Sequence, residues 1–169
     1  EISKIAGYDL FAETMKQLNK KQGKVFFLGS SDDVLNKMLL RAKDEYPCVN
    51  IEMLSPPFKP QFDYNDLKNF SDSINAFQPD VVFVGLTAPK QEKLIFKLRN
   101  MVNTKYFSGI GAVFDFYAGT VKRPSKIWVS LHLEWFVRFI GEPKRLWRRN
   151  FVSSPIFLID LIIFKYFRK

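Results

Sequence analysis

The segment from Val84 to Glu92, Val-Gly-Leu-Thr-Ala-Pro-Lys-Gln-Glu, contains side chains that can bind a phosphate and a sugar. The segment begins at the end of an apolar run and contains a proline suited to a first helical turn. We therefore expect it to join the end of a strand to the start of a helix. Free N–H groups and the helix dipole favour an anion there, and Lys90 adds to that attraction. Gln91 both donates and accepts hydrogen bonds, which suits sugar hydroxyls or an acetamido group. The candidate residues of this segment are Gly85, Thr87, Pro89, Lys90, Gln91 and Glu92. The plainer alternative is a helix cap with solvated charges.

Glycines follow the apolar runs that we interpret as strands, at Gly29, Gly85, Gly109 and Gly111. In an open parallel sheet, ligands bind beyond the carboxyl ends of the strands, and glycine lets the backbone approach a ligand closely. Any one of these glycines can be a simple turn, but four at one edge favour a binding site. The chain contains neither a P-loop nor a G-x-G-x-x-G fingerprint, which argues against Walker-type ATP binding and ordinary dinucleotide binding.

Asp115 is the only charged residue between Gly109 and Gly119. A buried carboxylate is costly unless it is hydrogen-bonded or bound to a ligand, and an acid at a strand end can accept two ribose hydroxyls. The alternative is that Asp115 caps neighbouring backbone N–H groups. His132 lies on an apolar helical stretch, so we expect it to pack and not to catalyse. Cys48 has no histidine nearby in the sequence, so we do not expect it to be a nucleophile.

The elements that must position these residues alternate between strand and helix. Strands are predicted at residues 24–29, 49–54, 80–85 and 105–110, and helices at 7–20, 30–46, 65–77 and 90–102. This order predicts an α/β fold, with a parallel Rossmann-like sheet flanked by helices and joined by right-handed crossovers. From Pro124 onward the pattern is helical only. We therefore expect two domains, an α/β donor-binding domain at 1–123 and a helical appendage at 124–169.

Charge is distributed unevenly over the 169 residues, whose formal net charge is +9. Residues 1–115 hold 15 basic and 14 acidic residues, whereas residues 116–169 hold 11 basic and 3 acidic ones. The 47% of hydrophobic residues excludes a disordered chain. A single cysteine indicates a reducing compartment, and neither a signal peptide nor a conventional membrane span is expected.

The basic C-terminal part combines a cationic cluster with an apolar run. Arg145, Arg148 and Arg149 are spaced three and four residues apart, which predicts one helix face shared with Lys144. The apolar run at 156–164 is about half the length of a membrane span and is bounded by lysine and arginine, as in an interfacial anchor. The alternative is that this run packs on the α/β domain and the arginines are merely solvated.

Several linked motifs resemble the WecG/TagA/CpsF glycosyltransferases. They are Gly-Tyr-Asp-Leu-Phe at 7–11, Phe-Leu-Gly at 27–29, residues 79–93 from Pro-Asp-Val-Val through Pro-Lys-Gln-Glu-Lys, the run 109–124 from Gly-Ile-Gly-Ala-Val-Phe-Asp to Lys-Arg-Pro, and Leu-Glu-Trp-Phe with Glu-Pro-Lys-Arg-Leu-Trp-Arg-Arg at 133–149. The resemblance covers nearly the whole chain. It implies transfer of a sugar, typically N-acetylmannosamine, from a UDP donor to an undecaprenyl-diphosphate-linked acceptor in teichoic acid, capsule or exopolysaccharide synthesis.

The resemblance also implies roles for particular residues and partners. Gln91 and its Pro-Lys-Gln-Glu turn belong to the donor site, with Gln91 as the catalytic candidate, and Asp115 contacts the nucleoside. No Asp-x-Asp triplet occurs, so no metal or other cofactor is expected. The expected partners are the UDP-sugar, the lipid-linked glycan and an anionic membrane surface, met by Lys144, Arg145, Arg148 and Arg149. We expect a cytoplasmic protein at the inner face of the plasma membrane, with homo-oligomerisation left open.

Members of the resembled family are longer at the N-terminus, where an Asp-Gly motif supplies the proposed catalytic base. No Asp of this sequence matches that base, so we expect these 169 residues alone to bind better than they catalyse. A catalytically incomplete module that binds a membrane or a nucleic acid is the alternative, because the tail interleaves aromatic and basic residues. The lack of a recognised nucleic-acid motif argues against RNA or DNA as the partner.

Overall fold

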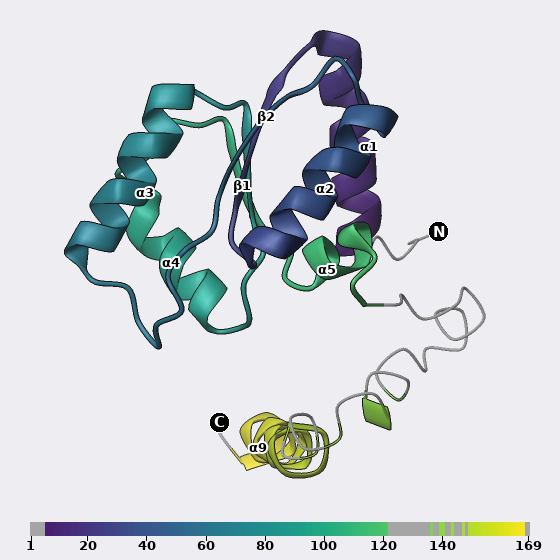
Figure 1. The fold of residues 1–169 in the computed structure, drawn as a ribbon. Coiled ribbons are helices and arrows are strands. Elements are labelled where there is room, and N and C mark those ends of the chain that lie inside the picture. Colours follow the sequence, from purple (N-terminus) through teal and green to yellow (C-terminus); the bar gives the residue numbers. More distant parts are fainter. Residues whose placement is uncertain are drawn as a thin grey trace. The chain divides into compact units, whose positions relative to one another are not determined.

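A computed structural model describes residues 6–121, 136, 139–140, 143, 147 and 149–167 of the chain. The chain divides into two compact units, Glu1–Lys122 and Arg123–Lys169, and each is considered by itself. Figure 1 shows the first unit as a sheet between two groups of helices. The functional roles expected for the two domains stay predictions.

The first unit is built on four parallel strands in the order β2-β1-β3-β4. The strands are β1 (Lys24–Leu28), β2 (Asn50–Leu54), β3 (Val81–Val84) and β4 (Tyr106–Gly109). Each lies within one residue of its predicted bounds, so the predicted parallel α/β fold is confirmed. Because β2 and β3 lie on opposite sides of β1, the chain reverses its direction of travel across the sheet at the β1–β3 boundary.

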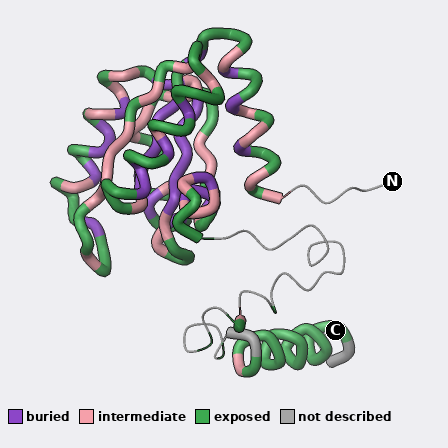
Figure 2. The backbone as a smooth tube through the Cα atoms, turned by 45° about the vertical axis from the view of Figure 1, so that its right-hand side comes forward, coloured by how far each residue is buried: buried purple, intermediate pink, exposed green. Residues whose placement is uncertain are grey.

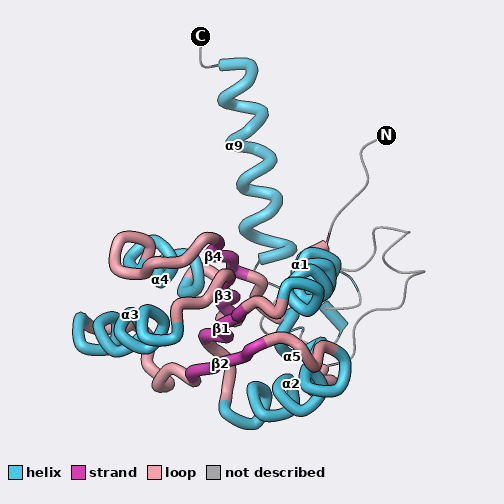
Figure 3. Tube along the Cα trace, turned by 90° about the horizontal axis from the view of Figure 1, so that it is seen from above, coloured by secondary structure: helices cyan, strands magenta, loops and turns pink. Residues whose placement is uncertain are grey.

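Helices cover both faces of the sheet, as seen along the strands in Figure 3. One face carries α1 (Gly7–Lys21), α2 (Asp32–Glu45) and α5 (Val113–Ala118), and the other carries α3 (Tyr64–Phe77) and α4 (Lys90–Leu98). Side chains cap two of these helices. The Ser31 hydroxyl accepts the N–H of Val34 at the start of α2, and Asp63 and Asp66 form a reciprocal capping box on α3.

Helix α4 ends four residues before the predicted end at Val102. The cause is Asn75 on α3, whose side-chain amide donates to the Met101 carbonyl and accepts the N–H of Asn103, each at 2.8 Å. These bonds satisfy backbone groups that a longer helix would have used internally. Pro89 is the cap of α4 and not a residue of its first turn.

Helix α5 was not predicted, and Asp115 does not lie at a strand end as expected. It lies in the first turn of this short helix, which comes after the tight turn that ends β4. The prediction failed because six residues contain too few turns to show a helical period.

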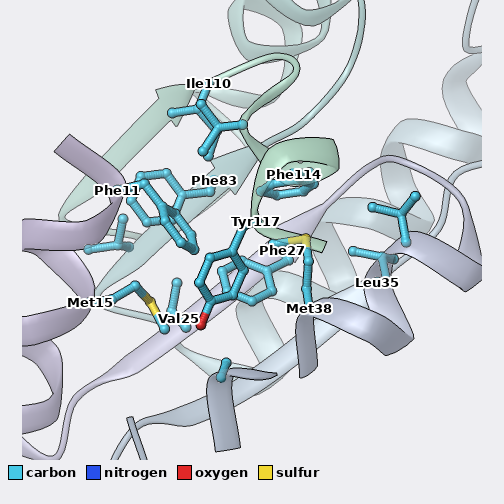
Figure 4. Packing of buried hydrophobic residues seen from close by; sticks show 14 of the residues in the cluster. Phe11, Met15, Val25, Phe27, Leu35, Met38, Phe83, Ile110, Phe114 and Tyr117 are labelled. Atoms are coloured by element: carbon cyan, nitrogen blue, oxygen red, sulfur yellow. The ribbon is translucent and has the colours of Figure 1, made fainter. Parts of the chain in front are cut away.

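The core lies on both faces of the sheet, and the buried strands form the centre of the unit in Figure 2. Along β1, Val25 and Phe27 enter the cluster under α1, α2 and α5, whereas Phe26 and Leu28 enter the cluster under α3 and α4. This alternation explains why the strand is apolar at consecutive positions. Figure 4 shows the first cluster, where Phe11 contacts Tyr117 with ring centroids 4.9 Å apart.

The described part of the second unit contains a π-helical turn, η1 (Arg149–Ser153), followed by the α-helix α9 (Ser154–Phe167). The predicted apolar run at 156–164 lies within α9, and its eight apolar residues are each at least 50% exposed. None of the helices in the described part of the chain is long and apolar enough to cross a membrane.

Candidate functional site

The candidate site lies at the carboxyl edge of the sheet, where the four parallel strands end together. Helix α2 leaves β1 toward one face and α4 leaves β3 toward the other, so the boundary between β1 and β3 is a topological switch point. Ligands of open α/β sheets bind outside the strands at such a point. The predicted residues Gly29 and Gly85 directly follow these two strands.

Protein atoms occupy the space beside both of these glycines. A Cβ atom on Gly85 would lie 2.2 Å from Cδ2 of Phe114, because the Phe114 ring of α5 packs directly on the strand end. A Cβ atom on Gly29 would lie 3.0 Å from the Gly85 carbonyl oxygen, and the φ angle of Gly29 is +110°. Both glycines therefore allow close packing within the protein, a role that the sequence could not separate from ligand binding.

Gln91 is buried in the first turn of α4, with 7% of its surface exposed. Its Oε1 accepts the N–H of Gly111 at 2.8 Å, and its Nε2 donates to Oε1 of Glu92 at 3.3 Å. The Gln91 amide also lies over Gly109, where a Cβ atom would be 2.3 Å from Nε2. The structure thus brings the predicted residues Gln91, Glu92 and Gly111 together.

Lys90 lies on the same helix turn but is directed to the loop before α3. Its ammonium donates to the carbonyl of Lys59 and lies 4.3 Å from the centroid of the Phe62 ring. The Lys59 ammonium in turn pairs with Asp66 and Asp63, and these hydrogen bonds raise the pKa of Lys59. The sequence did not indicate this partner of Lys90, because 31 residues separate Lys90 from Lys59.

Thr87 and Pro89 are exposed residues of the turn that enters α4. The Thr87 carbonyl accepts the N–H groups of Lys90 and Gln91, at 2.9 and 3.2 Å. The peptide bond between Ala88 and Pro89 is cis. The Thr87 carbonyl thereby holds the start of α4, while its hydroxyl-bearing side chain stays on the surface beside the sheet edge.

Asp115 is half-buried in the first turn of α5, next to the Phe114 that packs on Gly85. Its carbonyl oxygen accepts the N–H groups of Thr120 and Val121 at 3.1 and 3.3 Å, which closes the C-terminal end of α5. Asp115 is therefore tied through its own helix to the end of β3.

A cluster that sequence reasoning missed fastens α5 to α2. The Tyr117 hydroxyl donates to Oε2 of Glu45 at 3.0 Å, Arg41 donates to Oε1 of Glu45 at 2.7 Å, and Arg41 also donates to the Tyr117 carbonyl at 3.0 Å. Burial and the bond to Glu45 together raise the pKa of Tyr117 well above its ordinary value. The only sequence signal was the i, i+4 spacing of Arg41 and Glu45, which does not reveal a tyrosine 72 residues away.

The predicted acceptor and membrane residues Lys144, Arg145 and Arg148 lie outside the described residues. Arg149 begins η1, and only its backbone is described. Within the described part of the chain, no group of three or more His, Cys, Asp or Glu side chains is arranged to hold a metal ion. The absence of a metal requirement stays a prediction.

Comparison with known proteins places these features in a family. The chain is 36% identical over 160 residues to an N-acetylglucosaminyldiphosphoundecaprenol N-acetyl-β-D-mannosaminyltransferase of Bacillus spizizenii, and 34% identical over 160 residues to the protein of the same name in Bacillus subtilis. Each alignment covers 95% of this chain and 60% of the relative, so the chain spans about 60% of the length of the curated relatives it matches. The sequence model of the WecG/TagA/CpsF glycosyl transferases matches residues 1–169, and the chain belongs to that family.

Proposed function

We propose that the protein transfers an N-acetylhexosamine, N-acetylmannosamine in particular, from a UDP donor to an undecaprenyl-diphosphate-linked acceptor in cell-surface polysaccharide or teichoic acid synthesis. The family supports sugar transfer, and the names of the two Bacillus relatives support this sugar and a lipid-linked acceptor. The reaction needs the donor oriented, the acceptor hydroxyl deprotonated and the leaving diphosphate stabilised.

One observation carries the proposal at the level of this chain. The ends of β1, β3 and β4 bring Gly29, Gly85, Gln91 and Gly111 to a single edge at the switch point of the sheet. That edge is where nucleotides bind in open α/β folds. We assign the donor site to it, with Thr87 and Glu92 on its surface and Asp115 as the residue that contacts the nucleoside.

The remaining parts of the proposal concern charge and location. Lys90 and the N-terminus of α4 would contribute positive potential to the UDP diphosphate, and the basic residues Lys144, Arg145, Arg148 and Arg149 would meet the acceptor and an anionic leaflet. We propose metal-independent transfer at the inner face of the plasma membrane. The acceptor base would belong to the part of the relatives that this chain does not span.

Calorimetric titration with UDP tests the donor site. We expect saturable binding of UDP, and about a tenfold weaker Kd for Asp115→Asn, because one charge-assisted hydrogen bond contributes about 1.5 kcal/mol. Asp72→Asn is the matched control, since it removes the same charge from the surface of α3, where Asp72 pairs with Lys68. No binding of UDP at millimolar concentration would contradict the proposed function. An unchanged Kd for Asp115→Asn would remove Asp115 from the site.

A further inference from the structure

We infer that Gln91 is a positioning residue, whose side-chain amide holds the turn between β4 and α5 in place and so fixes the helix that carries Asp115. The consequence of this inference for UDP binding rests on the proposed function, because both concern the same donor site. It differs from the role expected from the sequence, in which Gln91 touches the sugar directly. On this inference Gln91 acts through Gly111.

The hydrogen bonds of Gln91 are made to protein groups at both ends of its amide. The carbonyl accepts the Gly111 N–H at 2.8 Å, a normal length for a backbone donor, and the NH2 group donates to Glu92 at 3.3 Å. Only 7% of the residue is exposed. A buried amide is costly to redirect toward a ligand, because the part-buried N–H of Gly111 would lose its acceptor.

The two glycines next to this bond provide the space and the backbone conformation that it requires. Gly109 provides the space in which the Gln91 amide lies, since a Cβ atom there would be 2.3 Å from Nε2 and 2.6 Å from Cδ. Gly111 has a φ angle of +53°, a conformation that residues with a side chain rarely adopt, and its N–H is the donor to Gln91. Gln91 of α4, Gly109 of β4 and Gly111 of the following turn are therefore matched to one contact.

The contact holds the turn that leads into the next helix of the chain. Residues 110–112 form the turn, α5 begins at Val113, and Phe114 packs on Gly85 at the end of β3. Gln91 thus connects the first turn of α4 to the turn before α5, across the edge where the donor site is proposed. Loss of the bond would free the turn, and with it the position of Asp115.

An exchange of two neighbouring side chains tests the inference. Gln91→Glu replaces the NH2 group that donates to Glu92 by a carboxylate oxygen, so repulsion between the two carboxylates should move the side chain at 91 away from the Gly111 N–H. The double variant Gln91→Glu, Glu92→Gln keeps the net charge of the natural pair and restores a donor at 92 facing an acceptor at 91. Gly109→Ala is an independent variant, because its new Cβ atom would displace the Gln91 amide. Gln17→Ala is the control, because it removes an exposed Gln–Glu hydrogen bond on α1.

Two measurements are made on the full 169-residue chain. Amide hydrogen exchange of Gly111, without nucleotide, should be about tenfold faster in Gln91→Glu and Gly109→Ala, and within about threefold of the natural chain in the double variant. The Kd for UDP should follow the same order, with Gln17→Ala unchanged in both. If the natural chain does not bind UDP, the proposed function fails, while the exchange data still decide the role of Gln91.

Either of two results would overturn the inference. The first is Gly111 exchange that is unaffected in Gln91→Glu and in Gly109→Ala. The second is a double variant with restored Gly111 protection but a Kd for UDP as weak as that of Gln91→Glu. That second result would mean that Gln91 contacts the donor directly and not through the turn.

Discussion

At the scale of single residues, Gly85 shows how a strand-ending glycine can serve the protein interior. The ring of Phe114 occupies the space where a side chain at position 85 would begin, so α5 approaches the end of β3 more closely than any other residue type would allow. The glycine sets the distance between the sheet edge and the helix that carries Asp115.

Gly85→Ala should therefore destabilise the protein by about 1–3 kcal/mol, the usual cost of overpacking a filled core. Urea unfolding followed by circular dichroism measures this change. Gly7→Ala is the control, because its new Cβ atom would lie 3.4 Å from Val113, an ordinary contact, and alanine favours helices. An unchanged free energy of unfolding in Gly85→Ala would show that the Phe114 ring can move aside at no cost.

Asp80 acts at the opposite edge of the sheet, where it joins three strands. Its carboxylate pairs with Lys105 before β4 at 2.7 Å and accepts the N–H of Lys24 in β1 at 3.0 Å. The hydrogen bond from Lys105, followed by that from Lys24, lowers the pKa of Asp80. The ionised form is thus favoured by folding, and the stability it contributes is lost as the pH falls below about 4, through the lowered pKa.

Asp80→Asn should cost about 1 kcal/mol at pH 7 and progressively less as the pH falls from about 4 toward 2. Urea unfolding of both proteins across this range measures the difference. Asp33→Asn, which removes an exposed carboxylate paired with Lys37, is the control and should show a much smaller difference at pH 7. A difference that does not depend on pH would contradict a role for the charge of Asp80.

At the scale of elements, the cluster of Arg41, Glu45 and Tyr117 fixes α5 to α2. The short α5 cannot be stable by itself, because helix nucleation is costly and six residues repay little of it. Its position depends on Phe114 and Tyr117 in the core and on the bonds of Tyr117 to α2. Burial, and then the bond to Glu45, raise the pKa of Tyr117, so folding favours the protonated phenol.

The stability that the Tyr117 phenol contributes should be complete below pH 10 and should decline as the pH rises above that value. Above pH 10 the unfolded chain loses this proton while the folded protein keeps it, which costs up to about 1.4 kcal/mol per pH unit. The free energy of unfolding should therefore fall more steeply between pH 9.5 and 11 in the natural protein than in Tyr117→Phe. Tyr64→Phe, at an exposed position, should retain the steep fall. Equal slopes in the natural protein and Tyr117→Phe would show that the Tyr117 phenol does not cause this pH dependence.

At the scale of the whole molecule, the exposed apolar helix α9 lies in the part of the sequence, residues 116–169, that carries most of the net positive charge. Apolar residues occupy consecutive positions 156–159 and 161–164 of α9, so they surround the helix instead of forming one stripe. At 14 residues, α9 is about 21 Å long, shorter than the roughly 30 Å of a bilayer core. These features support the proposal that the C-terminal part is the membrane module.

Co-sedimentation with anionic liposomes tests the membrane proposal. Binding should weaken with added salt and with the triple change Arg145/Arg148/Arg149→Glu, because each base near an anionic surface contributes roughly 1 kcal/mol. The control Lys16/Lys20/Lys21→Glu makes the same change of charge on α1 and should bind as the natural chain does. Deletion of 144–169 should abolish sedimentation. If the truncated chain sediments equally well, the membrane contact lies elsewhere.

The sequence by itself determined the elements of the α/β unit. The bounds of β1 to β4 followed from local patterns of apolar residues and from glycines at strand ends. The resemblance to the family was also visible in the sequence, because each of its motifs is an unbroken run of residues. Such signals are local, so they need no knowledge of distant partners.

Only the tertiary structure decided what the site residues contact. Phe114 fills the space at Gly85, Lys90 bonds to the carbonyl of Lys59, and Gln91 bonds to Gly111. These pairs lie 20 to 31 residues apart in the sequence, and the packing of strands and helices alone brings them together. A residue type states which bonds a side chain can make, but the choice among ligand, solvent and protein partner depends on what the fold places beside it.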